Sequence, residues 1–269
     1  MTPPSQAPCV LVLAGLDPSG GAGLFADVEA IRRIGARPLA VPTALTAQTL
    51  RRMHGFQPLS PQLAMQTARA VLEEEPVRAI KIGMVGTPAM ARAIAGLLAE
   101  ARLPAVVDPV LAASSGGALF QGGPEAAREA YAELFAGAIA TPNALEAQVL
   151  LGLAEPPRSA DALESAARDL VQRGARAALV KGGHAEGPES IDVLCEKDLC
   201  IHFAAHRLDK VARGTGCRLA SALAARLALG RGLEESARAA KALVLEHLAS
   251  AGSPREEQGV EAEGPPRRT

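Results

Sequence analysis

Aromatic residues are scarce in this chain of 269 residues, which contains no Trp, one Tyr and only 2% aromatics in all. Platforms for stacking nucleic acid bases are therefore few. An excess of positive charge is also absent, since 28 Lys and Arg stand against 29 Asp and Glu. No basic field exists to attract a nucleic acid backbone. We expect no nucleic acid partner, and a core built from Ala, Leu and Val.

Long apolar runs are missing as well. The run from Leu219 to Ala225 stops at Arg226, well short of the roughly 18–20 residues that a membrane span needs. The apolar run 9–15 has no basic leader and Asp17 follows it, so it is typical of a buried strand rather than a signal peptide. The four cysteines do not make a disulfide framework in a chain of this length. These absences predict a cytoplasmic protein with reduced cysteines and no membrane contact.

What the chain does contain is a regular alternation of strand-like and helix-like segments. The predicted strands are 9–14, 39–46, 78–82, 105–108, 138–140 and 177–180, with a hairpin of 191–195 and 200–204. The predicted helices are 23–34, 61–75, 88–102, 124–135, 143–151, 160–173, 216–229 and 233–249. Pro42 inside the second strand indicates an edge or a bulge. This order predicts one α/β domain over residues 8–250, with a mostly parallel sheet covered on both faces. The tails 1–7 and 251–269, rich in Pro, Gly and charge, are expected to be flexible.

Small and polar residues gather where predicted strands end and helices begin, which is where ligands bind in open α/β sheets. Residues 17–23 read Asp-Pro-Ser-Gly-Gly-Ala-Gly, and Asp27 follows. Small residues let the backbone approach a ligand, and the amides of a helix N-terminus can face an anion. The segment is neither a Walker A loop nor a dinucleotide fingerprint. An ordinary strand-to-helix turn is the alternative.

The segment Arg213-Gly-Thr-Gly-Cys217 opens a long predicted helix. Its amides, at Gly214, Thr215, Gly216 and Cys217, could form an anion hole at the positive end of the helix dipole. Such a hole would stabilise negative charge on a transferring phosphoryl group. The same field would lower the pKa of the Cys217 thiol and favour the thiolate. The alternative is a small buried cysteine on a tight turn.

Other strand ends carry charged or amide side chains. Asp108 could bind Mg²⁺ through water, and Lys181 could meet a phosphate. Asn143 and Glu146 have the spacing of a helix N-cap with its capping-box partner, or of an amide and a carboxylate that organise a metal and phosphates. Spacing does not separate these two interpretations. A set near the predicted hairpin imitates a zinc site, but its spacing matches no structural set and favours a surface hairpin. That set is Cys195, Cys200, His202 and His206.

Taken together, the motifs resemble those of the hydroxymethylpyrimidine/phosphomethylpyrimidine kinases, thiamin-biosynthesis members of the ribokinase superfamily. In order they are Asp-Pro-Ser-Gly-Gly-Ala-Gly at 17–23, Thr-Ala-Leu-Thr-Ala-Gln at 43–48, Lys-Ile-Gly-Met at 81–84, Asp-Pro-Val at 108–110, Thr-Pro-Asn-x-x-Glu at 141–146, Val-Lys-Gly-Gly-His at 180–184 and Gly-Thr-Gly-Cys at 214–217. The resemblance implies a ribokinase-like three-layer α/β/α sandwich with a hairpin beside the sheet, ATP and Mg²⁺, and a homodimer or larger assembly. It also implies two phosphorylations, of the alcohol 4-amino-5-hydroxymethyl-2-methylpyrimidine and then of its monophosphate.

The resemblance implies roles for individual residues. The matches to positions that hold or line the pyrimidine are Asp27, Gln48, Ala22, Met84 and Val110. The matches to the metal and phosphate region are Asp108, Asn143, Glu146 and Lys181. The matches to the anion hole are Gly214, Thr215 and Gly216. Cys217 matches the position where sugar kinases of the superfamily carry an Asp base, so its thiolate would take the proton of the substrate hydroxyl.

Several residues depart from the family pattern. Arg213 stands where the family usually has His, and the loop 209–213, which covers the nucleotide, is one residue short. Ser114 stands where a Lys is common, and the usual C-terminal motif is missing. Three hypotheses remain: the bifunctional pyrimidine kinase, a kinase for pyridoxal or related B6 vitamers, and a catalytically weak pyrimidine-binding paralogue.

Overall fold

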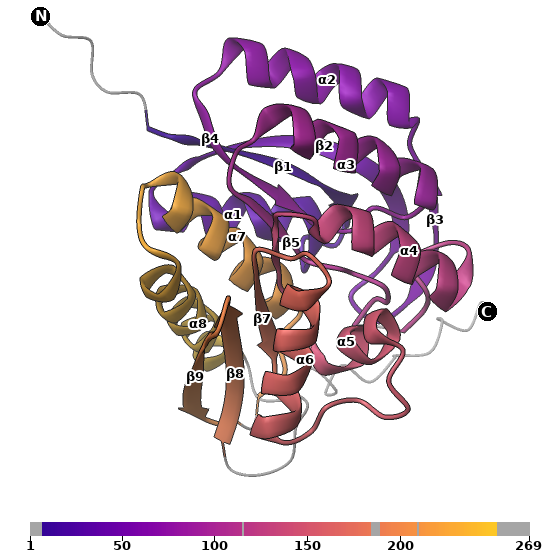
Figure 1. Ribbon diagram of the computed structural model, residues 1–269. Helices are drawn as coiled ribbons and strands as arrows, with labels where there is room; N and C mark the ends of the chain where they lie inside the picture. The colour runs from indigo at the N-terminus through magenta and orange to yellow at the C-terminus, as the bar shows by residue number, and fades with distance from the viewer. Residues whose placement is uncertain (1–6, 115, 184–188, 209, 252–269) are drawn as a thin grey trace, which may run out of the picture.

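A nine-stranded sheet runs through the molecule (Figure 1). The structure, a computed structural model, describes residues 7–114, 116–183, 189–208 and 210–251. The strands are β1 (Cys9–Leu16), β2 (Arg37–Gln48), β3 (Met53–Pro58), β4 (Val77–Ile82), β5 (Ala105–Val107), β6 (Ile139–Ala140), β7 (Ala177–Lys181), β8 (Glu189–Glu196) and β9 (Leu199–His206). Their order is β3-β2-β1-β4-β5-β6-β7-β8-β9. The strands from β2 to β7 in this order are parallel, and the pairs β2–β3, β7–β8 and β8–β9 are antiparallel.

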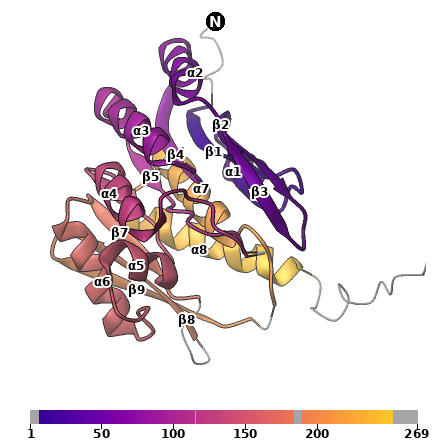
Figure 2. The ribbon, with the colours of Figure 1, turned by 90° about the vertical axis from the view of Figure 1, so that its right-hand side faces the viewer.

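Helices cover both faces of the sheet (Figure 2). They are α1 (Gly23–Ile34), α2 (Pro61–Glu74), α3 (Pro88–Ala101), α4 (Gly123–Phe135), α5 (Ala144–Leu151), α6 (Ala160–Gln172), α7 (Thr215–Ala228) and α8 (Leu233–Ser250). Alternate residues of β1 enter two separate cores, because successive side chains of a strand point to opposite faces. Leu11 and Leu13 pack on the side of α2 to α6, whereas Val10 and Val12 pack on the side of α1, α7 and α8. The predicted layered fold, with a mostly parallel sheet, is confirmed.

Local sequence signals explain where several helices begin and end. Ser60 and Thr87 cap α2 and α3, each accepting a hydrogen bond from a backbone N–H in the first turn, and a Pro follows each cap. Pro is favoured there because its missing N–H would be unpaired in any case. Gly35 ends α1 with a φ of 93°, a conformation that favours glycine. These signals lie in the sequence itself, so the predicted starts of these helices agree with the structure.

The two ends of the sheet agree with expectation to different degrees. Strand β3, which pairs with the second half of β2, was not predicted from the sequence. Pro42 lies in β2 at a register shift against β1, between the pairs Ala14–Pro42 and Gly15–Ala44. The bulge expected at this proline is therefore confirmed. At the other end, the predicted hairpin of 191–195 and 200–204 is confirmed, because β8 and β9 pair antiparallel and β8 also pairs with β7.

The cysteines of the hairpin are joined in a disulfide, Cys195–Cys200. The expectation of reduced cysteines is wrong for this pair, because the register of β8 and β9 places the two residues directly opposite each other. Cys9 and Cys217 are free. His202 contacts Glu164 of α6 at 2.7 Å rather than joining a metal set. Within the described ranges, no helix has the length and apolar character needed to cross a bilayer. The predicted flexible tails fall almost wholly outside the described residues, as does His184.

Candidate active site

A cavity of about 580 Å³ lies beyond the carboxyl ends of the parallel strands. Its wall contains nearly all of the predicted site residues: Ala22, Gln48, Met84, Asp108, Val110, Asn143, Glu146, Lys181, Arg213, Gly214, Thr215, Gly216 and Cys217. Ser114, the departure from the family's Lys, also lines it. A second hollow, around Met65 and Arg69 on the outer side of α2 and α3, gathers no comparable set of polar groups. The strand ends therefore converge on one chemically equipped cavity.

At one end of the cavity a lysine meets the start of α7. Lys181, the last residue of β7, donates a hydrogen bond of 2.7 Å from Nζ to Oδ1 of Asp108, just beyond β5. A Cβ added at Gly216 would lie 3.0 Å from this Nζ and under 4 Å from the Asp108 carboxylate. Glycine at this position thus lets the N-terminus of α7 approach the ion pair. The positive end of a helix and an ammonium group together suit bound phosphate.

Glu146 has the structural role that its spacing allows. The Asn143 side chain accepts a hydrogen bond of 2.8 Å from the Glu146 N–H, and the Asn143 N–H donates one of 2.8 Å to Glu146 Oε2. This is a complete capping box at the start of α5. Burial and the neighbouring Asp108 carboxylate together raise the pKa of Glu146 to about 7, against the opposing effect of the Lys181 ammonium. Two acidic groups therefore share one nearby lysine.

This donor set fits the Mg²⁺ that the resemblance implies. Asp108 and Glu146 present carboxylate oxygens to the same cavity, and Mg²⁺ prefers such oxygens together with water and substrate phosphates. A cation beside them would also relieve the repulsion that raises the Glu146 pKa. Over the described part of the chain, no group of three or more His, Cys, Asp or Glu gathers into a metal cluster.

Cys217 lines the cavity in the first turn of α7, whose N-cap is Gly214 with a φ of 69°. A Cβ at Gly214 would lie 2.3 Å from the carbonyl oxygen of Gly21, so the close approach of the two loops requires glycine. Burial raises the pKa of the Cys217 thiol to about 11, although the Lys81 ammonium lowers it. The expected lowering of this pKa is therefore wrong, because desolvation of the charged form outweighs the helix dipole. The group is a thiol at neutral pH.

Asp27 does not line the cavity. Its side chain is fully buried, and its Oδ1 accepts hydrogen bonds from Lys81 Nζ at 2.7 Å and from Ser221 Oγ at 2.8 Å. Its Oδ2 has no hydrogen-bond partner among the described residues, and the expected contact of this carboxylate with a pyrimidine ring stays a prediction. Lys81 does line the cavity, and it was missed as a site residue although its motif was noted. Its signal is a charged residue in the buried part of β4, between Ile80 and Ile82.

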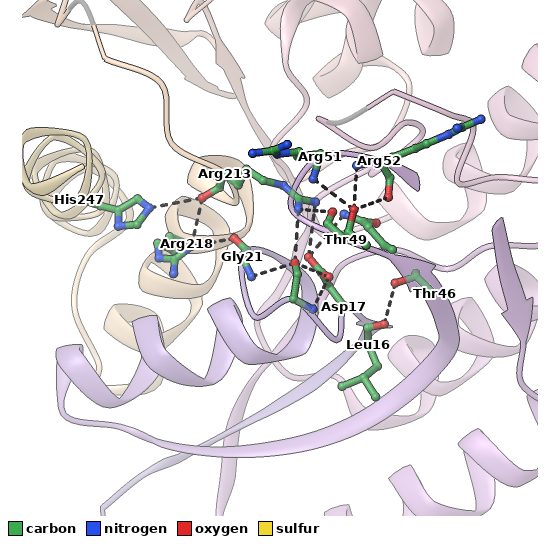
Figure 3. A network of polar contacts seen from close by, with 12 residues as sticks. Leu16, Asp17, Gly21, Thr46, Thr49, Arg51, Arg52, Arg213, Arg218 and His247 are labelled. Atoms are coloured by element: carbon green, nitrogen blue, oxygen red, sulfur yellow. Dashed lines mark hydrogen bonds and ion pairs between the residues drawn. The ribbon is translucent and has the colours of Figure 1, made fainter. Parts of the chain in front are cut away.

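Arg213 joins segments that lie far apart in the sequence (Figure 3). Its Nη1 donates to the Thr49 carbonyl oxygen at 2.9 Å and to Ser19 Oγ at 3.3 Å, and its Nη2 lies 3.5 Å from Oδ2 of Asp17. Gln48 Nε2 donates to the same Asp17 oxygen at 3.5 Å. Asp17 is thus a second cavity residue that the sequence analysis did not select. The guanidinium lies against the loop 17–21.

Comparison with known proteins agrees with this geometry. The family model described as phosphomethylpyrimidine kinase matches residues 17–261. The chain belongs to the phosphomethylpyrimidine kinase family. A relative of this kinase, the hydroxymethylpyrimidine/phosphomethylpyrimidine kinase of Rhizobium meliloti (strain 1021), is 38% identical over 93% of this chain and 92% of its own length. The predicted family and the kinase assignment are therefore confirmed.

Solved structures of related kinases have the same fold. A phosphomethylpyrimidine kinase from Clostridium difficile 630 is 31% identical, with a TM-score of 0.75 over 89% of this chain and 99% of that one. The pyridoxal kinase from Staphylococcus aureus in complex with AMP-PCP and pyridoxal is 26% identical, with a TM-score of 0.81 over 90% of this chain and 88% of that one. The ribokinase-like fold class is thereby confirmed. The pyrimidine kinase and the pyridoxal kinase hypotheses are each represented among the similar structures.

Proposed function

We propose that this protein is a hydroxymethylpyrimidine/phosphomethylpyrimidine kinase of thiamin biosynthesis. It uses ATP to phosphorylate 4-amino-5-hydroxymethyl-2-methylpyrimidine to the monophosphate and then to the diphosphate. The observation that carries this proposal is one cavity with two chemically distinct ends. One end offers an amide and apolar side chains that suit a small heteroaromatic ring. The other offers Lys181, two carboxylates and the N-terminus of α7, which suit phosphates and a cation.

The ring end is built for a small, polar heterocycle. Gln48 ends β2 and has one amide donor turned to Asp17, so its carbonyl oxygen is available to accept from an amino group. We assign Ala22, Met84 and Val110 to the apolar lining. A site with few, directed polar groups discriminates strongly, because a wrong ligand leaves buried groups unpaired. This favours an aminopyrimidine over an apolar ring.

The phosphate end supports transfer to a hydroxyl. In the first reaction the substrate oxygen attacks the γ-phosphorus of ATP, its proton leaves, and ADP departs with the electrons of the broken P–O bond. We assign the acceptance of that proton to the sulfur of Cys217, which must first lose its own proton. The amides of Gly214, Thr215 and Gly216, with Lys181 and Asn143, would stabilise the negative charge of the phosphoryl group. Bound Mg²⁺, held by Asp108 and Glu146, would supply positive charge to the ATP phosphates.

We also propose that the enzyme acts in the cytoplasm as a homodimer, as the family pattern implies. The large supply of ATP and Mg²⁺ in that compartment suits the donor set of the cavity. Analytical ultracentrifugation at micromolar concentration tests the assembly. A sedimentation coefficient that corresponds to a single chain of 269 residues would contradict the dimer.

A second candidate is a kinase for pyridoxal, which the likeness to the Staphylococcus aureus pyridoxal kinase favours. An assay coupled to ADP release, run with the pyrimidine alcohol, its monophosphate and pyridoxal, separates the candidates. We expect the pyrimidine alcohol to give the highest kcat/KM. A higher value for pyridoxal would assign the protein to B6 metabolism, and no turnover with any of the three would indicate a binding protein.

A further inference from the structure

Arg213 has two side-chain donors that form no hydrogen bond within the described part of the chain. Its Nε and Nη2 are buried atoms, and no acceptor among the described residues forms a hydrogen bond with either. The Asp17 carboxylate lies 3.5 Å from Nη2 as an ion-pair partner. Buried donors without partners are unfavourable, so their presence in a cavity wall indicates a ligand that accepts from them. A guanidinium presents donors in a fork that matches carboxylate and phosphate oxygens.

The position of Arg213 is fixed from the backbone outward. Its carbonyl oxygen accepts from Arg218 Nη1 of α7 and from His247 Nε2 of α8, both at 3.3 Å (Figure 3). Its side chain lies against the loop of α1, since a Cβ at Gly21 would be 3.5 Å from Arg213 Cβ and 3.6 Å from its Cδ. Such a side chain loses little conformational freedom on binding a ligand.

The partners of Arg213 lie on the ring end of the cavity. Thr49 directly follows Gln48, and Asp17 accepts from Gln48. By contrast, Lys181, Asp108 and Glu146 form a separate group of charges. The neighbouring Arg51 and Arg52 are exposed, and their backbone N–H groups donate to Thr49 Oγ1. Two further positive charges therefore belong to the segment that contacts Arg213. The ligand that would bind Arg213 is therefore an anionic group attached to the substrate that carries the ring.

We infer that Arg213 recognises the phosphate group of the monophosphate substrate and so determines how well the second phosphorylation proceeds. This inference rests on the proposed function and departs from the expected nucleotide-binding role of Arg213. In the second reaction a phosphate oxygen of the substrate attacks the γ-phosphorus of ATP, and ADP leaves with the electrons of the broken bond. A phosphate monoester is largely dianionic at pH 7, since its second pKa is about 6. The nucleophile therefore needs no base, but its charge needs a counter-charge.

The two reactions thus make different demands on two neighbouring residues. The first requires removal of a proton, which we assign to Cys217. The second brings two anions together, which a permanently charged guanidinium assists. Arg213→Met should lower kcat/KM for the monophosphate about 10–100-fold more than kcat/KM for the alcohol, as expected for loss of a hydrogen-bonded charge. Cys217→Ala should change the ratio of the two values in the opposite direction.

The experiment measures both kcat/KM values at saturating ATP for the wild type, Arg213→Met, Arg213→Lys, Arg213→His and Cys217→Ala. Arg213→Lys keeps the charge without the fork and should give an intermediate ratio. Arg92→Met, which removes an exposed arginine of α3, is the matched control and should leave the ratio unchanged. Calorimetric titration of the monophosphate without ATP gives a second measurement, and circular dichroism verifies folding of each variant.

The outcomes separate the inference from the proposed function. An equal fall in both kcat/KM values for Arg213→Met would make Arg213 a nucleotide-binding residue and overturn the inference. An unchanged ratio would do the same, as would a wild type that phosphorylates the alcohol but not the monophosphate. A wild type that phosphorylates neither pyrimidine would instead refute the proposed function. If Arg213→Met does not fold, the same test is applied to the Lys and His variants. A ratio of kcat/KM for the monophosphate to kcat/KM for the alcohol that equals the wild-type ratio in both variants would overturn the inference.

Discussion

At the scale of single residues, Cys217 illustrates the competition between a helix dipole and burial. The positive end of the helix dipole lowers the pKa of a thiol in the first turn of α7. Its side chain is half-buried, however, and the loss of hydration there, together with the carboxylates of Asp27 and Asp108, raises its pKa to about 11. Lys81 and the Gly23 backbone N–H act in the other direction. A base with so high a pKa is almost entirely protonated at neutral pH. The rate of a reaction that needs its thiolate must therefore depend on pH.

The pH dependence of the first reaction follows from this pKa. A base acts only when deprotonated, and each pH unit below about 11 reduces the thiolate fraction about tenfold. We expect kcat for the alcohol to rise steeply between pH 7 and 10, whereas kcat for the monophosphate stays nearly flat. Cys217→Ala should lose the pH dependence and about 10²–10⁴-fold in rate for the alcohol. A flat profile for the alcohol in the wild type would remove Cys217 from the role of base.

Gln48 offers a second prediction at this scale. Gln48→Ala deletes the amide that we assign to the pyrimidine ring, so the KM for the alcohol should rise about tenfold. The KM for ATP should stay nearly constant, because Gln48 contacts Asp17 rather than Lys181 or Asp108. Gln57→Ala, on the exposed side of β3, is the matched control and should alter neither constant. Equal rises in both KM values for Gln48→Ala would show that the ring binds elsewhere.

At the scale of elements, α5 combines a cap with chemistry. Glu146 closes the capping box with Asn143 and also faces the cavity. Its pKa of about 7 lies above its ordinary value of 4.5, so between these values the folded protein binds more protons than the unfolded chain. The stability that this group contributes therefore falls as pH rises from about 4.5 through 7. Lys181 therefore does not fully offset the cost of ionising Glu146, which a further cation beside the carboxylate would reduce.

Glu146→Gln separates the two roles of this residue. Gln can still accept from the Asn143 N–H, so the cap should survive. The Tm of the variant minus that of the wild type should increase from pH 5 to pH 8 in the absence of divalent cations, because Gln does not ionise. With ATP, kcat should fall and the half-saturating Mg²⁺ concentration should rise. If differential scanning fluorimetry shows this increase while rate and Mg²⁺ dependence are unchanged, Glu146 is structural only.

Predictability also differs between elements. Helix α1 was predicted with its observed bounds, since an amphipathic pattern and Gly35 define it locally. Strand β3 was missed because its six residues include Gly55 and Pro58 and it pairs with one strand alone. The site wall could be predicted because strand ends meet at one edge. The partners of Arg213 could not, because Ser19 and Thr49 are 194 and 164 residues away in the sequence. The buried pair Asp27–Lys81 likewise depends on tertiary contact.

At the scale of the whole molecule, the cavity connects segments from both halves of the chain. Its wall takes residues from β1, β2 and the loop after β5, and from β7 and α7. The ion pair Asp27–Lys81 and the bond from Ser221 to Asp27 join α1, β4 and α7 behind this wall. A ligand in the cavity therefore contacts segments that pack into the hydrophobic cores on both faces of the sheet. Its binding energy should stabilise the entire domain rather than one part.

Thermal unfolding tests this coupling, and with it the prediction of a single domain over residues 8–250. A ligand that binds only the folded state at 100 times its Kd adds about 2.7 kcal/mol to the free energy of unfolding, so the Tm should rise by roughly 5–10 °C. We expect one calorimetric transition, shifted as a whole by Mg²⁺ with a non-hydrolysable ATP analogue. Lys181→Met should reduce the shift, because the ammonium group that suits phosphate is lost, whereas Arg92→Met should not. Two transitions, of which the ligand moves only one, would show that the chain folds as separate units and that the cavity belongs to one of them.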